Sequence, residues 1–136
     1  MRVVVAGGAG FLGSHLCDAL LERGDQVVCV DNFVTGSGLT VAHRIGRGDF
    51  ELFEHDVTRP FDDDLGGPID AVMNLASPAS PKDYLALPIE TLDVGSIGTR
   101  QLLELARRHD ARFFMASTSE VYGDPLVHPQ TEGYWG

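Results

Sequence analysis

The sequence of 136 residues predicts one α/β domain, a doubly wound parallel sheet with the strand order 3-2-1-4-5. Three observations predict this fold. Short β-branched segments alternate with segments of helical periodicity, as in successive β-α-β units with right-handed crossovers. A glycine-rich turn separates the first of these strands from the first helix. Hydrophobic residues make up 43% of the chain, enough for the core of one domain of this length but not of two.

The first strand is predicted over Arg2–Ala6, a β-branched run that ends at a glycine cluster. The first helix follows, because Leu12, Leu16 and Leu20 recur at helical spacing. Gly24 is predicted to end this helix.

The second strand is predicted over Gln26–Asp31, where only the last residue is charged. A loop rich in Gly, Ser and Thr covers Phe33–Leu39, and a short helix is expected around Thr40–Ile45. Phe50–Glu54 is the third predicted strand.

The fourth strand is predicted over Ile69–Leu75, after which Pro78 and Pro81 should break the chain. A long helix is expected from Pro88 to about His109. One face of this helix is predicted to carry Leu92, Ser96, Thr99, Leu103 and Ala106. The fifth strand is predicted over Arg112–Ala116.

Charge and cysteine content narrow the classes of function. Ten basic and 20 acidic residues give a net charge of -10, which argues against nucleic-acid and anionic-membrane partners. The longest apolar runs, such as Val3–Ala6, are too short to span a bilayer, and the start shows no signal-peptide pattern. Cys17 and Cys29 form no CxxC pair and are expected to be buried, reduced thiols of a cytoplasmic protein, with a disulfide in a secreted protein as the alternative. The acidic run 62–64 is interpreted as a solvated loop, and no metal site is predicted.

A GxxGxxG motif lies between the first strand and the first helix. Gly7 permits a tight turn, Gly10 lets the backbone approach a pyrophosphate, and Gly13 allows close packing of helix and strand. The phosphates would then bind the free N–H groups at the positive end of the helix. Asp31 ends the second strand 18 residues after Gly13, where a carboxylate accepts hydrogen bonds from ribose hydroxyls and repels a 2′-phosphate. The motif therefore predicts NAD rather than NADP, although Asp31 could instead form an Asx turn.

Two further segments belong to this predicted site. Asp56 and Val57 follow the third strand, where the adenine ring of a dinucleotide would lie in such a fold. Leu75, Ala76 and Ser77 close the fourth strand at the carboxyl edge of the sheet, where doubly wound folds bind their ligands.

The segments GGAGFLGSHLCDALLERGDQVVCVDNFVTG, HDVT, LASPASPKDY and ASTSEVYGDPLVHPQTEGYWG resemble the extended short-chain dehydrogenase/reductase family. Within this Rossmann-fold family, the last segment is most similar to the UDP-glucuronate decarboxylase (UDP-xylose synthase) branch. The resemblance implies that Gly10, Phe11 and Leu12 contact the pyrophosphate of NAD. It also implies that the adenosine ribose is surrounded by Asp31, Asn32, Phe33, Thr35 and Gly36, with Asp56 and Val57 at the adenine.

The resemblance also implies a reaction. In that branch NAD+ oxidises C4 of UDP-glucuronate, the resulting 4-ketone lets CO2 leave, and the returned hydride gives UDP-xylose. The implied roles are a contact of Thr118 with the 4-hydroxyl and of Glu120 with the hexose ring. Relatives that dehydrate carry an Asp-Glu pair where this chain has Ser119 and Glu120, so a single carboxylate argues against 4,6-dehydration. Ser119 could also be no more than a hydroxyl that caps a turn.

The chain departs from the family pattern at several positions. Glu90 and Asp93 stand where lysines are common, and Gly95 replaces an expected asparagine. Ser37 and Thr40 replace a basic residue and an asparagine in the adenosine loop.

The catalytic Tyr-x-x-x-Lys pair of the family would lie shortly after Gly136. Tyr122 does not replace it, because Leu126 stands four residues later. The sixth strand and the substrate domain are likewise expected outside residues 1–136. The chain is therefore interpreted as the NAD-binding, amino-terminal portion of an enzyme that is a homodimer at full length. Alternatives are another sugar-nucleotide epimerase or dehydratase, or a non-catalytic NAD-binding remnant.

Overall fold

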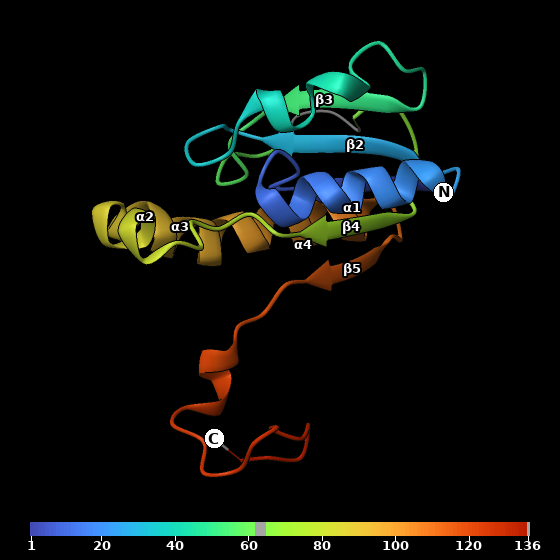
Figure 1. Cartoon of the computed structure of the whole chain (residues 1–136). Helices are drawn as coiled ribbons and strands as arrows, with labels where there is room; N and C mark the ends of the chain where they lie inside the picture. Colours follow the sequence, from blue (N-terminus) through green and yellow to red (C-terminus); the bar gives the residue numbers. More distant parts are fainter. Residues whose placement is uncertain (62–64, 136) are drawn as a thin grey trace.

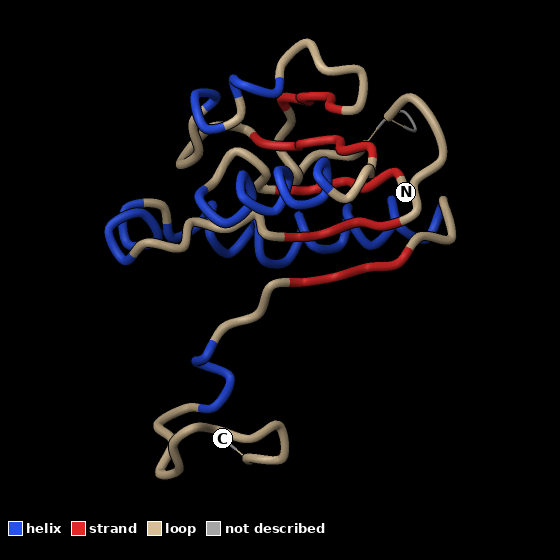
Figure 2. The backbone as a smooth tube through the Cα atoms, turned by 45° about the vertical axis from the view of Figure 1, so that its right-hand side comes forward, coloured by secondary structure: helices blue, strands red, loops and turns tan. Residues whose placement is uncertain are grey.

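The computed structural model describes residues 1–61 and 65–135, so the acidic run 62–64 lies outside the described residues. The predicted fold is confirmed: one five-stranded, all-parallel sheet has the order β3-β2-β1-β4-β5 (Figures 1 and 2). The strands are β1 (Arg2–Ala6), β2 (Gln26–Asp31), β3 (Phe50–Glu54), β4 (Ala71–Asn74) and β5 (Arg112–Met115). The α-helices are α1 (Phe11–Glu22), α2 (Pro81–Ala86), α3 (Pro88–Asp93) and α4 (Thr99–Arg108). Shorter helical turns are η1 (Gly38–Thr40), η2 (Ala42–Arg44), the π-helical η3 (Val94–Gly98) and η4 (Ser119–Tyr122).

The sheet has a hydrophobic core on each face, with α1 on one side and α4 on the other (Figure 1). Alternation along β1 divides its side chains between them, since Val3 packs with the α1 side and Val4 with the α4 side. Cys17 of α1 and Leu102 of α4 are fully buried in these two cores. A fully buried aliphatic side chain contributes about 1.5–3 kcal/mol, so burial on both faces stabilises the central strands.

The strand register brings the carboxyl ends of the central strands to one edge. Ala6 of β1 is paired with Val30 of β2 and with Asn74 of β4. The backbone turns that follow these three strands therefore begin side by side. This edge is where the candidate site lies.

Several predicted boundaries differ from the structure. β4 covers only Ala71–Asn74, because the Asn74 side chain accepts a hydrogen bond from the Ala76 N–H (3.1 Å) and turns the chain there. β5 likewise ends one residue earlier than predicted, at Met115. Pro81 does not only break the chain but occupies the first turn of α2. The short helix expected around Thr40–Ile45 consists of the two 3-10 turns η1 and η2.

The long predicted helix is present as α3, η3 and α4 in succession, and the face predicted from its periodicity is not the one that packs on the sheet. Leu92 and Leu103 are 66% and 47% exposed, whereas Leu102 and Leu105 are fully buried. Leu92 lies before the π-helical turn η3 and Leu103 after it, so the face that they share is turned to solvent on both sides of this turn. The side that packs on the sheet carries Val94, Gly98, Leu102 and Leu105, which recur at intervals of three or four residues. Of the residues predicted to share one face, Ala106 is the one that lies in the buried core.

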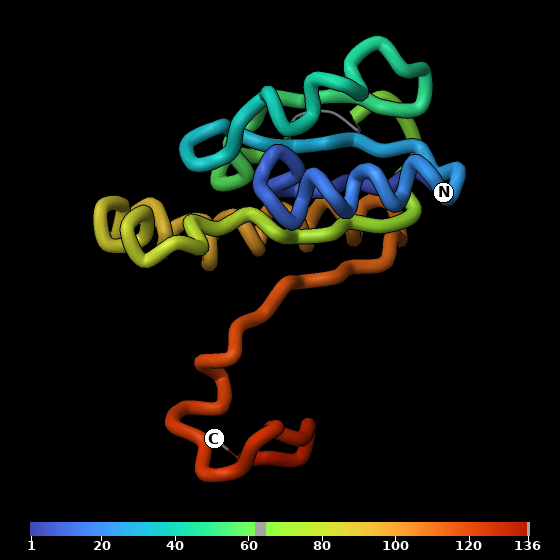
Figure 3. Tube along the Cα trace, in the orientation of Figure 1, coloured from blue at the N-terminus to red at the C-terminus, as the bar shows by residue number. Residues whose placement is uncertain are grey.

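After β5 the chain leaves the sheet, and Figures 1 and 3 show residues 116–135 extending away from the body of the domain. Large apolar side chains in residues 116–135 are exposed, with Leu126 at 90% and Trp135 at 95%. Within this extension the Leu126 N–H donates to the Tyr134 hydroxyl (3.1 Å). Phe114 and Met115, at the end of β5, are also about half exposed.

Candidate functional site

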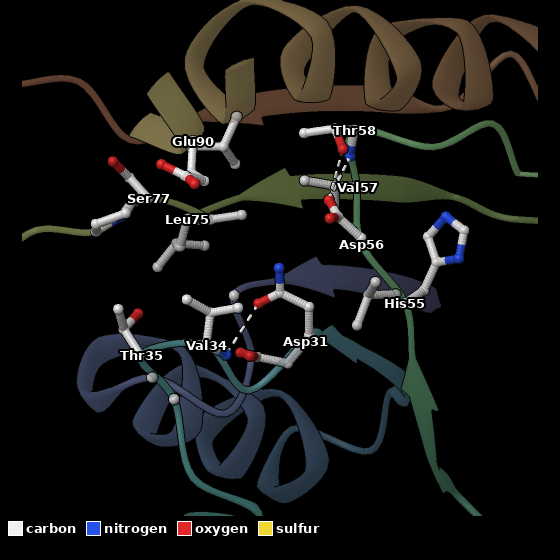
Figure 4. Close-up of a pocket in the computed structure, with 18 of the residues that line it drawn as sticks. Asp31, Val34, Thr35, His55, Asp56, Val57, Thr58, Leu75, Ser77 and Glu90 are labelled. Carbon is white, nitrogen blue, oxygen red and sulfur yellow. Dashed lines mark hydrogen bonds between the residues drawn. The ribbon is translucent and has the colours of Figure 1, made fainter. Parts of the chain in front are cut away.

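A cavity of about 250 Å³ opens at the carboxyl edge of the sheet (Figure 4). Four of its walls are the segments that directly follow β1, β2, β3 and β4, and the fifth is α3 with the start of η3. Ligands of open α/β sheets bind in this place, next to the first strand and outside the carboxyl ends.

Eleven of the predicted site residues line this cavity. They are Gly7, Gly10, Asp31, Asn32, Thr35, Gly36, Asp56, Val57, Leu75, Ala76 and Ser77. Phe11 and Leu12 lie beside it on the first turn of α1, with exposed side chains. Gly13 lies beneath the glycine turn, and Phe33 stands in the loop after β2. The structure thus gathers the residues predicted to bind a dinucleotide around one cavity.

The glycine turn is so close-packed that side chains are sterically excluded. Gly7 has a φ of +75°, and a Cβ there would lie 2.8 Å from the backbone of Leu75 and Ala76. A Cβ on Gly13 would lie 2.1 Å from the Gly7 carbonyl oxygen. Helix α1 therefore starts directly against the end of β1.

The N-terminus of α1 is suited to an anion. Gly10 is its N-cap residue, no side chain caps this end, and the first turn contains no acidic residue. Free N–H groups and the helix dipole both favour negative charge at such an end. The arrangement can therefore hold a phosphate group against the cavity.

Asp31 is buried (7% exposed) and held by two backbone N–H groups. One carboxylate oxygen accepts from Ala9 (2.9 Å) and the other from Phe33 (2.9 Å). The second contact is an Asx turn, the alternative that the sequence allowed, and it holds Phe33 at a φ of +57°. Each oxygen keeps a second lone pair, so the Asx turn and a further hydrogen bond to a ligand are compatible. A Cβ on Gly36 would lie 2.9 Å from the same carboxylate, which shows how closely the loop approaches it.

Asp56 is fixed in the same manner on the third wall. One oxygen of its carboxylate accepts from the Thr58 N–H (2.9 Å) and the Thr58 hydroxyl (2.8 Å). Burial alone would raise the pKa of Asp56, but these hydrogen bonds and the nearby charges of Arg59 and His55 together hold the pKa below its ordinary value. Val57 is buried behind it, and a Cβ on Gly98 would lie 2.9 Å from the Val57 side chain. This wall is therefore held by local hydrogen bonds and lies in contact with η3.

A buried arginine ties the loop after β2 to α1. Arg44 is 2% exposed, and its Nε donates to Asp18 (2.6 Å). Its two remaining nitrogens donate to the carbonyl oxygens of Thr40 (2.9 Å) and Ser14 (2.7 Å). The hydrogen bond from Arg44 lowers the pKa of Asp18, and a second one from His43 adds to this. These contacts hold η1 and η2 in place behind the loop that carries Thr35 and Gly36.

Nine further residues line the cavity and were not predicted to bind cofactor. They are Val30, Val34, His55, Thr58, Pro78, Leu87, Glu90, Asp93 and Val94. Five of them adjoin predicted residues in the sequence, which is a signal that could have found them. The four on α3 and its ends are brought to the cavity only by tertiary packing.

The structure does not bring Thr118, Ser119 and Glu120 to the cavity. They lie in the exposed extension after β5, where Thr118 is the N-cap residue of η4. The Glu120 N–H donates to the Thr118 hydroxyl (3.5 Å), so the hydroxyl that caps this turn is that of Thr118 and not of Ser119.

Other predicted features can be compared with the structure directly. Cys17 and Cys29 are buried and free, as expected. Within residues 1–61 and 65–135, no cluster of three His, Cys, Asp or Glu side chains could hold a metal ion. None of the helices described is long and apolar enough to cross a membrane.

Comparison with known proteins identifies similar chains. UDP-glucuronic acid decarboxylase 1 of Danio rerio is 53% identical over 135 residues, which cover 99% of this chain and 31% of that protein. UDP-glucuronic acid decarboxylase 4 of Arabidopsis thaliana is 51% identical over 136 residues, 100% of this chain and 30% of that protein. The chain therefore spans about a third of the length of the curated relatives it matches.

Solved structures of epimerases have the same fold. A UDP-galactose 4-epimerase matches with a TM-score of 0.78 at 37% identity, over 99% of this chain and 44% of that one. UDP-glucose 4-epimerase from Bifidobacterium longum, in complex with NAD+ and UDP, matches with a TM-score of 0.82 at 30% identity, over 98% and 42%. The model of the family described as "NAD dependent epimerase/dehydratase family" matches residues 3–134. The chain belongs to the NAD dependent epimerase/dehydratase family.

Proposed function

We propose that residues 1–136 are the NAD-binding portion of an enzyme that converts UDP-glucuronate into UDP-xylose. The observation that carries the cofactor assignment is one cavity that combines the uncapped N-terminus of α1 with the buried carboxylate of Asp31. The assignment of the reaction is supported by identities of 51–53% to UDP-glucuronic acid decarboxylases over almost the whole chain.

The residues present fit a dinucleotide. In the proposed arrangement the pyrophosphate binds the N–H groups at the start of α1, which the glycines leave accessible. Asp31 accepts hydrogen bonds from the adenosine ribose and disfavours a 2′-phosphate, so the chain binds NAD in preference to NADP. The adenine ring lies along Asp56 and Val57. When bound, NAD supplies a hydride acceptor for oxidation at C4 of the sugar.

The sugar end of the proposed site comprises Thr118, Ser119 and Glu120. A threonine hydroxyl can hold the 4-hydroxyl of the hexose, and one carboxylate beside it suits decarboxylation better than the paired acid and base of a dehydratase. No tyrosine within residues 1–136 has a lysine four positions later, since the one lysine is Lys82. We therefore assign turnover to a longer protein, a homodimer in the cytoplasm, in which further residues supply the base.

A sugar-nucleotide 4-epimerase is the second candidate. It is favoured by the 37% identity to a UDP-galactose 4-epimerase and by the common fold. Both reactions begin with oxidation at C4, so the same cavity serves either of them. The two reactions differ in the steps that follow this oxidation at the sugar. In the proposed enzyme, residues outside the cavity determine those steps.

The cofactor assignment is tested by ligand binding. Calorimetric titration of the chain with NAD+ and NADP+ should give binding of NAD+, at least about tenfold tighter than that of NADP+. No heat of binding with NAD+ for folded protein would refute the cofactor assignment.

The reaction is tested in a chimera. Residues 1–136 replace the matching segment of UDP-glucuronic acid decarboxylase 1 of Danio rerio, and in a second chimera that of the UDP-galactose 4-epimerase. Formation of UDP-xylose from UDP-glucuronate by the first chimera, measured by mass spectrometry, supports the proposal. An active epimerase chimera beside a folded, NAD-binding but inactive decarboxylase chimera would favour the second candidate.

A further inference from the structure

Helix α3 contributes two carboxylates, Glu90 and Asp93, to the wall of the cavity that faces the loops after β2 and β3. They are three positions apart and therefore lie on one face of the helix. Figure 4 shows the Glu90 side chain beside Ser77 and Leu75, across the cavity from Asp31. Four carboxylates thus surround the proposed dinucleotide site.

Glu90 and Asp93 differ from Asp31 and Asp56 in their hydrogen-bonding partners. Asp31 accepts hydrogen bonds from two backbone N–H groups, and Asp56 from the N–H and hydroxyl of Thr58. In residues 1–61 and 65–135 neither Glu90 nor Asp93 has a hydrogen-bonding or ion-pair partner for its side chain. The described lining of the cavity also contains no lysine or arginine. The field of Glu90 and Asp93 therefore acts directly on any ligand that occupies the cavity.

We infer that Glu90 and Asp93 determine the charge selectivity of this site and bias it toward NAD+ over NADH. The inference rests on the proposed dinucleotide site. The two forms of the cofactor share the pyrophosphate and differ by one positive charge on the nicotinamide ring. Repulsion of the pyrophosphate by the carboxylates is common to both forms, whereas attraction of the cationic ring favours only NAD+. The ratio of the two affinities thus isolates the effect of these side chains.

The size of the effect can be calculated from Coulomb's law. Two unit charges about 10 Å apart, in a solvated cleft of effective dielectric constant about 40–80, change an affinity ratio by about two- to fourfold. When both charges are removed, the factors by which each one changes the ratio of NAD+ to NADH affinity should multiply. Salt screens exposed charges, so the effect should diminish as ionic strength rises.

The test is a charge series measured on the folded chain. Dissociation constants for NAD+ and NADH are determined by calorimetry, and for NADH also by its fluorescence, for wild type, Glu90→Gln, Glu90→Lys and the double variant Glu90→Gln/Asp93→Asn. Glu22→Gln and Glu22→Lys are the matched controls, because Glu22 is an exposed carboxylate at the opposite end of α1. Circular dichroism confirms that each variant is folded.

We expect the preference for NAD+ to fall about two- to fourfold in Glu90→Gln and further in Glu90→Lys and the double variant. The differences should shrink as salt is raised from about 20 mM to about 500 mM, and the Glu22 variants should retain the wild-type ratio. An unchanged ratio in Glu90→Lys and in the double variant, with NAD+ still bound, would overturn this inference alone. Failure of the wild-type chain to bind either form would overturn the proposed site and the inference with it.

Discussion

Replacement of Gly13 by alanine tests whether the contact between α1 and the end of β1 is essential to the site. The added Cβ would lie 2.1 Å from the Gly7 carbonyl oxygen, 2.8 Å from the Gly8 Cα and 2.9 Å from the Gly7 carbonyl carbon. All three atoms belong to the backbone, so no side-chain rotation can relieve the overlap. The start of α1 must move by about 1 Å to bring the shortest of these distances to 3.0 Å.

Two effects of known size should result. Overpacking of this kind costs about 1–3 kcal/mol of the free energy of unfolding. A shift of about 1 Å also misplaces the N–H groups proposed to bind the pyrophosphate, and a hydrogen bond to a charged group contributes about 1.5–3 kcal/mol. Loss of one such bond weakens NAD+ binding at least about tenfold.

Urea denaturation and calorimetric titration measure the two effects separately. Gly95→Ala is the matched control, because no atom lies within 4 Å of a Cβ built at that position. Since alanine favours a helix over glycine, the control should unfold with a free energy about 0.5–1 kcal/mol higher and bind NAD+ as the wild type does. The reasoning is refuted if Gly13→Ala matches Gly95→Ala in both stability and affinity.

Three further predictions concern Asp31, Asp18 and activity. Asp31→Ala should weaken NAD+ binding by about 1.5–3 kcal/mol and narrow the gap to NADP+, as calorimetry can show; unchanged affinity would contradict the assignment. The hydrogen bond from Arg44 lowers the pKa of Asp18, so Asp18 stabilises the fold above its unfolded pKa, and this contribution is lost as the pH falls through the lower, folded value. Because the Asp18 side chain is 40% exposed, solvent screens the pair, and Asp18→Asn should unfold only about 1 kcal/mol more easily at pH 7. The gap should close below about pH 4, and a gap independent of pH would exclude the ion pair as its cause. The isolated chain should form no UDP-xylose from UDP-glucuronate and NAD+, because no tyrosine within residues 1–136 is followed by a lysine four positions later; product above a heat-killed control would disprove this.

The sequence was sufficient to predict the strands because each depends on a local pattern. Val3, Val4 and Val5 form an uninterrupted buried run, and the glycine motif marks where β1 ends. The face of the long helix could not be predicted in the same way. Leu102, Leu103 and Leu105 are all apolar, so periodicity alone does not decide which face of the helix packs on the sheet.

The candidate site was predictable where residues adjoin a strand end. Asp31, Asp56 and Leu75 each lie at or just after the end of a strand, and parallel pairing places all three at one edge. Glu90 stands well beyond the last of these ends, on α3, and the turn η3 that follows this helix packs against Val57. Its place in the cavity is a property of the tertiary structure alone.

The exposed end of β5 has a consequence for the behaviour of this chain in solution. Among the described residues no strand pairs with the outer side of β5, so its peptide groups can accept a strand from another molecule. Phe114 and Met115 add apolar surface at the same border, while the net charge of -10 keeps molecules apart. Salt screens the repulsion and leaves the apolar contact intact. The colloidal stability of the chain should therefore decrease as ionic strength rises, the reverse of ordinary salting-in.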